Sequence, residues 1–191
     1  MLLRPSGASS RPARARHPAT RSPVPEKTPV REGVRLAVDV GSVRVGVARS
    51  DPDGVLASPL TVLRSGPRNP GQRAELDELA TLAAGANVIE VIVGLPTSLS
   101  GRDSTAASGA RAFAAELAWL LAPIPVRLVD ERFTTTQAHD ALRQGGKDSR
   151  ARRGVVDAAA AAVLLQGALD AERATGRPPG QLVTVHKGAS T

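Results

Sequence analysis

The sequence predicts an α/β protein in which helices flank a mixed β-sheet. Three apolar, β-branched segments follow one another early in the chain, with turn residues between them. This pattern predicts a three-stranded antiparallel meander. Helix-like and strand-like segments then alternate along the rest of the chain, which is typical of parallel strands joined by helices.

The strands of the predicted meander span about residues 34–40, 43–50 and 55–63. Gly41 and Ser42 separate the first two strands, because glycine and serine favour turns between apolar runs. The segment Asp51 to Gly54 is a strong turn signal before the third strand. We expect Pro59 to bend or break that strand, since proline cannot donate a hydrogen bond to a neighbouring strand.

The later elements follow from the spacing of apolar residues. Apolar residues at intervals of three and four predict helices, and short β-branched runs predict buried strands. The expected helices span about 72–84, 104–121, 134–143 and 153–174, and the expected strands span 88–94 and 126–129. A further short strand is expected at about 182–185.

One folded domain, residues 34–174, is expected between two tails. Residues 1–33 hold six of the fifteen prolines and few large apolar residues, so we expect a disordered basic tail. Residues 175–191 are expected to form a loose C-terminal tail. The formal charge is +7, and residues 1–33 hold seven basic but only two acidic side chains. Most of the excess positive charge therefore lies in the first tail. That tail is either a solvated segment without a partner or an RNA-binding arm.

Composition excludes several classes of function. The chain has no cysteine, which rules out disulfides, cysteine zinc sites and a catalytic thiol. Three aromatic residues are too few for a base-stacking platform, so a nucleic acid would be held by its phosphates. No segment has the length or composition of a membrane span or a secretion signal. We therefore expect a cytoplasmic protein with no membrane partner.

Three carboxylates lie where predicted strands end or a helix begins. Asp39 ends the first strand, Glu131 follows the strand at 126–129, and Asp157 lies in the first turns of the last helix. Ligands of α/β sheets gather at such positions, and Mg²⁺ prefers oxygen ligands. Each residue also has a simpler role. Asp39 could cap a turn, Glu131 could pair with an arginine, and Asp157 could interact with the helix dipole.

Four motifs resemble those of the YqgF (RuvX) family and occur in the same order. They are Ala37–Ala48, Val93–Pro96, Asp130–Thr135 and Val156–Ala160. The resemblance covers roughly residues 34–170. It implies an RNase H-like fold, a relationship to Holliday-junction resolvases, and a nuclease that matures the 5′ end of pre-16S rRNA.

The resemblance further implies that Asp39, Glu131 and Asp157 are catalytic residues that hold one or two Mg²⁺ or Mn²⁺ ions. Three carboxylates beside a phosphodiester need nearby cations, so we expect Arg132, Arg152 and Arg153 to bind the substrate backbone. Neighbouring strand residues face opposite sides of a sheet, which favours a structural role for Asp130.

Several functions remain open from the residues alone. The first is a metal-dependent endonuclease acting on RNA, with pre-16S rRNA or a pre-ribosomal particle as its partner. The same chemistry could act on branched DNA. A non-catalytic RNA-binding assembly factor is a third possibility. An actin-like ATPase is a fourth, although a single short domain without a second phosphate loop argues against it.

Overall fold

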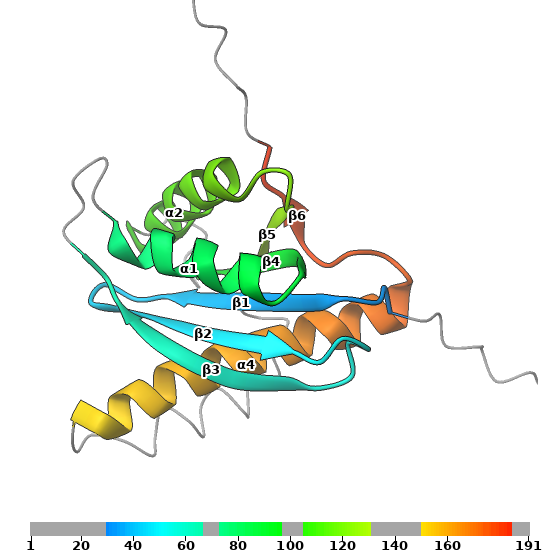
Figure 1. Cartoon of the computed structure of the whole chain (residues 1–191), viewed down its shortest axis with the longest axis horizontal. Coiled ribbons are helices and arrows are strands. Elements are labelled where there is room, and N and C mark those ends of the chain that lie inside the picture. Colours follow the sequence, from blue (N-terminus) through cyan, green and yellow to red (C-terminus); the bar gives the residue numbers. More distant parts are fainter. Residues whose placement is uncertain (1–29, 67–72, 97–104, 131–149, 185–191) are drawn as a thin grey trace, which may run out of the picture.

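The computed structural model of the chain describes residues 30–66, 73–96, 105–130 and 150–184, with side chains from Val155 onward in the last range. One six-stranded sheet carries helices on both faces (Figure 1). The strands are β1 (Val34–Val40), β2 (Arg44–Ser50), β3 (Ala57–Arg64), β4 (Val88–Leu95), β5 (Val126–Asp130) and β6 (Gln181–Leu182). The helices are α1 (Ala74–Gly85), α2 (Thr105–Leu121) and α4 (Arg150–Thr175).

The sheet is mixed, as the sequence predicts. Its strand order is β3-β2-β1-β4-β5-β6. Strands β1, β2 and β3 form the antiparallel meander, β4 and β5 run parallel to β1, and β6 pairs with β5 in the antiparallel sense. The carboxyl ends of β1, β4 and β5 therefore meet at one edge of the sheet, where α/β proteins commonly place their sites.

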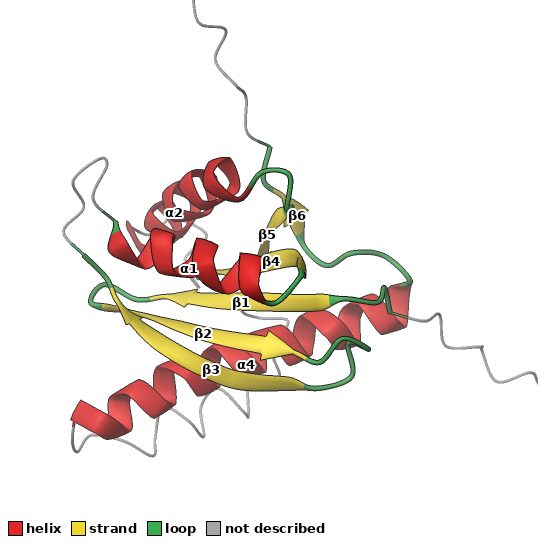
Figure 2. Ribbon diagram, viewed as in Figure 1, coloured by secondary structure: helices red, strands yellow, loops and turns green. Residues whose placement is uncertain are grey.

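The two faces of the sheet carry different cores. Leu36 and Val38 of β1 pack in the core beneath α1 and α2, whereas Ala37 between them packs against α4. Alternate strand residues face opposite sides, so this division follows from the pleat. Figure 2 shows α1 and α2 on one face and α4 on the other. None of the described helices is long and apolar enough to cross a bilayer.

Among the element boundaries that differ from the prediction, the starts of β3 and α4 have clear physical causes. The side chain of Asp51 accepts hydrogen bonds from the backbone amides of Val55 and Leu56, at 2.7 and 2.9 Å. The turn therefore continues through Leu56, and β3 begins at Ala57 rather than at residue 55. Helix α4 begins at Arg150, three residues before the predicted start, because arginine is a good helix former. The helix predicted at 134–143 lies outside the described residues.

A group of charges, three of them buried, ties the last turns of α4 to the sheet. We call it the ion cluster, and it comprises Arg31, Arg35, Glu90, Arg127 and Glu172. Helix α4 runs against the direction of β1, so its final turns lie beside the first residues of β1 (Figure 1). Although the sequence prediction included Arg31 in the N-terminal tail, this residue contacts both glutamates of the cluster.

The ion cluster is densely bonded. The Arg31 Nε atom lies 2.7 Å from Glu172 Oε1, and its Nη2 atom lies 2.8 Å from Glu90 Oε2. Arg127 Nε donates to the other oxygen of Glu90 at 2.8 Å. Arg35 donates from Nη2 to Glu172 at 3.1 Å. Each glutamate therefore contacts at least two arginines, which compensates the cost of burying its charge.

The charges of the ion cluster shift the ionisation of its members. Burial alone would raise the pKa of the Glu172 carboxyl, but hydrogen bonds from Arg31 and the charge of Arg35 outweigh burial and lower that pKa. Burial lowers the pKa of the Arg35 guanidinium, and the nearby glutamates oppose that change. The side chain of Arg35 is fully buried, so its charge depends on these partners.

Replacing Glu172 by Gln should lower the free energy of unfolding by about 3 kcal/mol at pH 7, because Arg31 and Arg35 lose a buried partner. The lowered pKa sets the pH dependence. The stabilisation by ionised Glu172 is complete above the unfolded-state pKa and is lost as the pH falls through the lower folded-state pKa. The difference between wild type and variant should therefore shrink below about pH 4.

Urea denaturation followed by circular dichroism, at pH 7 and at pH 3, measures both effects. Asp170→Asn is the matched control, since Asp170 lies on the same helix and pairs with Arg173 while its side chain is 57% exposed. An exposed pair of this kind should contribute less than about 0.5 kcal/mol. Equal losses for the two variants would show that the ion cluster does not anchor α4.

Candidate functional site

Asp39 lies near the carboxyl end of β1, on the face that α4 covers. It alternates in phase with Ala37, which packs against α4, and out of phase with Val38, which packs in the other core. In the antiparallel ladder Asp39 is opposite Gly46 of β2. The residue is half-buried. The alternation of the strand places its carboxylate on the α4 side of the sheet, beside Gly46, which has no side chain.

Helix α4 makes backbone contact with β2 at that glycine. A Cβ atom on Gly46 would overlap the carbonyl group of Asp157 and would lie 3.2 Å from the amide nitrogen of Ala158. A glycine inside a strand commonly marks such a close approach of another backbone. Ala158 and Ala161 are buried beside this contact, so small residues on both elements permit it. Asp157 is thereby held next to the strand position that pairs with Asp39.

Arg44 supplies a positive charge to the same seam between α4 and the sheet. Its Nε atom donates a hydrogen bond to Asp157 Oδ2 at 2.5 Å. The two side chains are 29% and 30% exposed, respectively. Arg44 precedes Gly46 by two residues, so both face α4. The sequence prediction included Arg44 only as part of a motif. The two-residue spacing between Arg44 and Gly46 could have shown that both residues face the same side of the sheet.

The remaining predicted site residues are described only in part, as are the surroundings of Asp130, to which the prediction gave a structural role. Asp130 ends β5 and alternates in phase with Leu128 of the α1–α2 core, which places it on the face away from α4. Arg152 and Arg153 lie in the first turn of α4, where the backbone alone is described. Glu131 and Arg132 lie outside the described residues. Within the described ranges, no group of three His, Cys, Asp or Glu residues could hold a metal ion.

The seam suits a hard cation better than other chemistry. Its described donors are the carboxylates of Asp39 and Asp157, and Mg²⁺ and Mn²⁺ favour oxygen donors. Two acidic side chains on one partly buried seam repel each other unless positive charge lies close by. Arg44 provides part of that charge. We call Asp39, Arg44, Gly46 and Asp157 the carboxylate seam.

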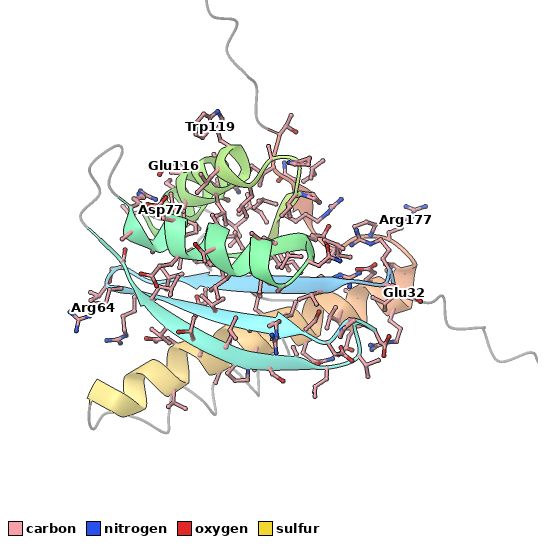
Figure 3. All side chains as sticks on the ribbon, viewed as in Figure 1. Glu32, Arg64, Asp77, Glu116, Trp119 and Arg177 are labelled. Atoms are coloured by element: carbon pink, nitrogen blue, oxygen red, sulfur yellow. The ribbon has the colours of Figure 1, made fainter. Side chains whose placement is uncertain are left out.

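A groove of about 460 Å³ lies elsewhere, between α1 and α2. Figure 3 labels three of the residues that line it, Asp77 on α1 and Glu116 and Trp119 on α2, on the face of the sheet away from α4. Two carboxylates and one arginine, Arg73, line the groove. Arg73 pairs with Glu116 at 3.2 Å. The groove lies across the sheet from α4 and is therefore a feature separate from the carboxylate seam.

Replacing Gly46 by Ala should lower the free energy of unfolding by about 2 kcal/mol, because the new methyl group pushes α4 away from β2. Thermal and urea denaturation measure the loss. Gly85→Ala is the matched control, since a Cβ at Gly85 meets no atom within 4 Å. That control should leave stability unchanged or raise it by less than about 1 kcal/mol. A Gly46→Ala protein as stable as wild type would contradict the backbone contact.

Residues 33–171 match the RuvX family, which is described as Holliday junction resolvase. A relative from Thermobifida fusca, named "Putative pre-16S rRNA nuclease", is 55% identical over 161 residues, which cover 81% of this chain and 98% of the relative. A relative of the same name from Streptomyces coelicolor is 50% identical over 158 residues, which cover 82% of this chain and 91% of the relative. The structure of T. thermophilus RuvC in complex with Holliday junction substrate is 17% identical, with a TM-score of 0.49, and covers 79% of this chain and 99% of that one. The resemblance carried by the four sequence motifs is thus confirmed, and the chain belongs to the RuvX family.

Proposed function

We propose that this protein is a metal-dependent endonuclease that hydrolyses phosphodiester bonds in the precursor of 16S rRNA. The observation that carries the proposal is the seam on which Gly46 brings Asp157 beside the strand position of Asp39. Membership of the RuvX family and the names of the curated relatives support the nuclease reaction and the RNA substrate. Such a substrate implies a cytoplasmic protein whose partner is a pre-ribosomal particle.

Asp39 and Asp157 would hold the metal, with Glu131 as the third carboxylate. All three side chains offer oxygen, which fits Mg²⁺ or Mn²⁺, and the number of ions is one or two in this proposal. A bound ion of this class activates water and stabilises negative charge on phosphate oxygens. The chain itself would supply the ligands, exclude part of the solvent from Asp39, and keep Asp157 in place through the backbone contact at Gly46.

Arg132, Arg152 and Arg153 would bind the phosphate backbone of the substrate. Arg152 and Arg153 precede Asp157 by about one turn of α4, so one helix would carry both a metal ligand and substrate contacts. Phosphate contacts of this kind position a nucleic acid without reading its sequence. The choice of cleavage site would then depend on the shape of the RNA.

Branched DNA is the second candidate substrate, favoured by the description of the RuvX family as Holliday junction resolvase. The carboxylate seam serves either substrate, because the metal acts on the phosphodiester group that RNA and DNA share. The two candidates differ in the shape of nucleic acid that the surrounding surface accepts.

Asp39→Asn and Asp157→Asn should each reduce Mg²⁺-dependent cleavage of a pre-16S rRNA fragment by at least about 100-fold, because each removes a proposed metal ligand. Single-turnover cleavage of end-labelled RNA measures the rate. A four-way DNA junction, assayed in parallel, separates the two candidate substrates. Preferential cleavage of the junction would favour the second candidate and overturn the first.

Asp77→Asn is the matched control, because Asp77 carries the same functional group on α1, across the sheet from α4. Its cleavage rate should stay within about twofold of wild type. Circular dichroism of all three variants checks that they are folded. Folded Asp39→Asn and Asp157→Asn proteins that cleave at the wild-type rate would exclude the carboxylate seam as the active site.

A further inference from the structure

Arg44 contacts the carboxylate that the proposed function gives to a metal ion. Its guanidinium donates a hydrogen bond to Oδ2 of Asp157. Arg44 lies on β2, two residues before Gly46, the glycine against which the backbone of Asp157 packs. A cation of the protein and a cation from solution would therefore compete for one carboxylate. Arg44 was not among the residues that the sequence prediction gave a role in the site.

The stability of the fold does not account for this contact. Both side chains are about 30% exposed, and ion pairs with this exposure contribute little to stability. The backbone contact at Gly46 already fixes where Asp157 lies on the sheet. The ion cluster anchors the far end of α4 through Glu172. Arg44 thus acts on the charge of the Asp157 side chain more than on the position of the helix.

We propose that Arg44 is the built-in counter-cation of the metal site: it holds the Asp157 carboxylate when no metal is bound and releases it when the ion binds. This inference rests on the proposed function. Its chemical consequence is a metal affinity lower than that of the carboxylates alone, because the ion must displace an intramolecular partner. A site with lower intrinsic affinity fills best when substrate phosphate supplies additional oxygen ligands.

Titration calorimetry of Mn²⁺ binding, without nucleic acid, tests the inference. Arg44→Gln should bind Mn²⁺ about fivefold more tightly than wild type, because the competing cation is gone. Arg44→Lys keeps the charge and should bind within about twofold of wild type. In the absence of metal the Gln variant should melt at a lower temperature than wild type, and saturating Mn²⁺ should narrow that gap.

Arg49→Gln is the matched control, since Arg49 lies on the same strand and alternates onto the opposite face from Arg44. Its Mn²⁺ affinity should equal that of wild type. In an Asp157→Asn background, Arg44→Gln should no longer tighten binding, because the carboxylate for which both cations compete is absent. This comparison separates the specific contact from a general effect of protein charge.

The outcomes distinguish this inference from the proposed function. If wild type binds Mn²⁺ and Arg44→Gln binds equally or more weakly, the counter-cation role is wrong while the metal site stands. If Arg49→Gln tightens binding as much as Arg44→Gln, the effect is one of overall charge and the inference is also wrong. If wild type binds no Mn²⁺, the metal site and the inference fail together.

Discussion

The close approach of α4 to β2 at Gly46 is the constraint on which the rest of the structure depends. Any side chain at this position would separate the two backbones, and Asp157 would move away from the sheet. The same contact requires small residues on the facing side of the helix, which explains the buried alanines of α4. Because Gly46 has no Cβ atom, α4 packs directly against β2, and Asp157 lies beside the strand position that pairs with Asp39.

The two halves of α4 carry their charges in different ways. Near the end of the helix, Glu172 is buried and bonded to two arginines, so its charge is compensated permanently. Near the start, Asp157 has one described arginine partner and remains partly exposed. A fully compensated carboxylate has little left to offer a ligand, whereas a half-exposed carboxylate with an exchangeable partner can bind one. The helix therefore combines an anchored end with an end that carries a partly exposed carboxylate.

Local sequence patterns predicted most of the strands, because β-branched runs and turn residues act over short distances. Strand β1 has the predicted bounds of 34–40, and β4 ends within one residue of the predicted 88–94. Long-range contacts could not be predicted in this way. Nothing near Gly46 in the sequence indicates that a helix more than 100 residues later rests on it. Arg31 was missed for the same reason, since its glutamate partners lie far along the chain and its neighbours resemble a tail.

The ion cluster has a mechanical consequence for the distant end of α4. Glu172 and Asp157 are fifteen residues apart on one helix, a span of about 22 Å at the usual helical rise. A tilt of about 3° about the ion cluster would carry Asp157 through about 1 Å, and the backbone contact at Gly46 opposes that tilt. Helix α4 is in this sense a beam held at two supports, the ion cluster beside the first residues of β1 and the backbone of Gly46 near the opposite edge of the sheet.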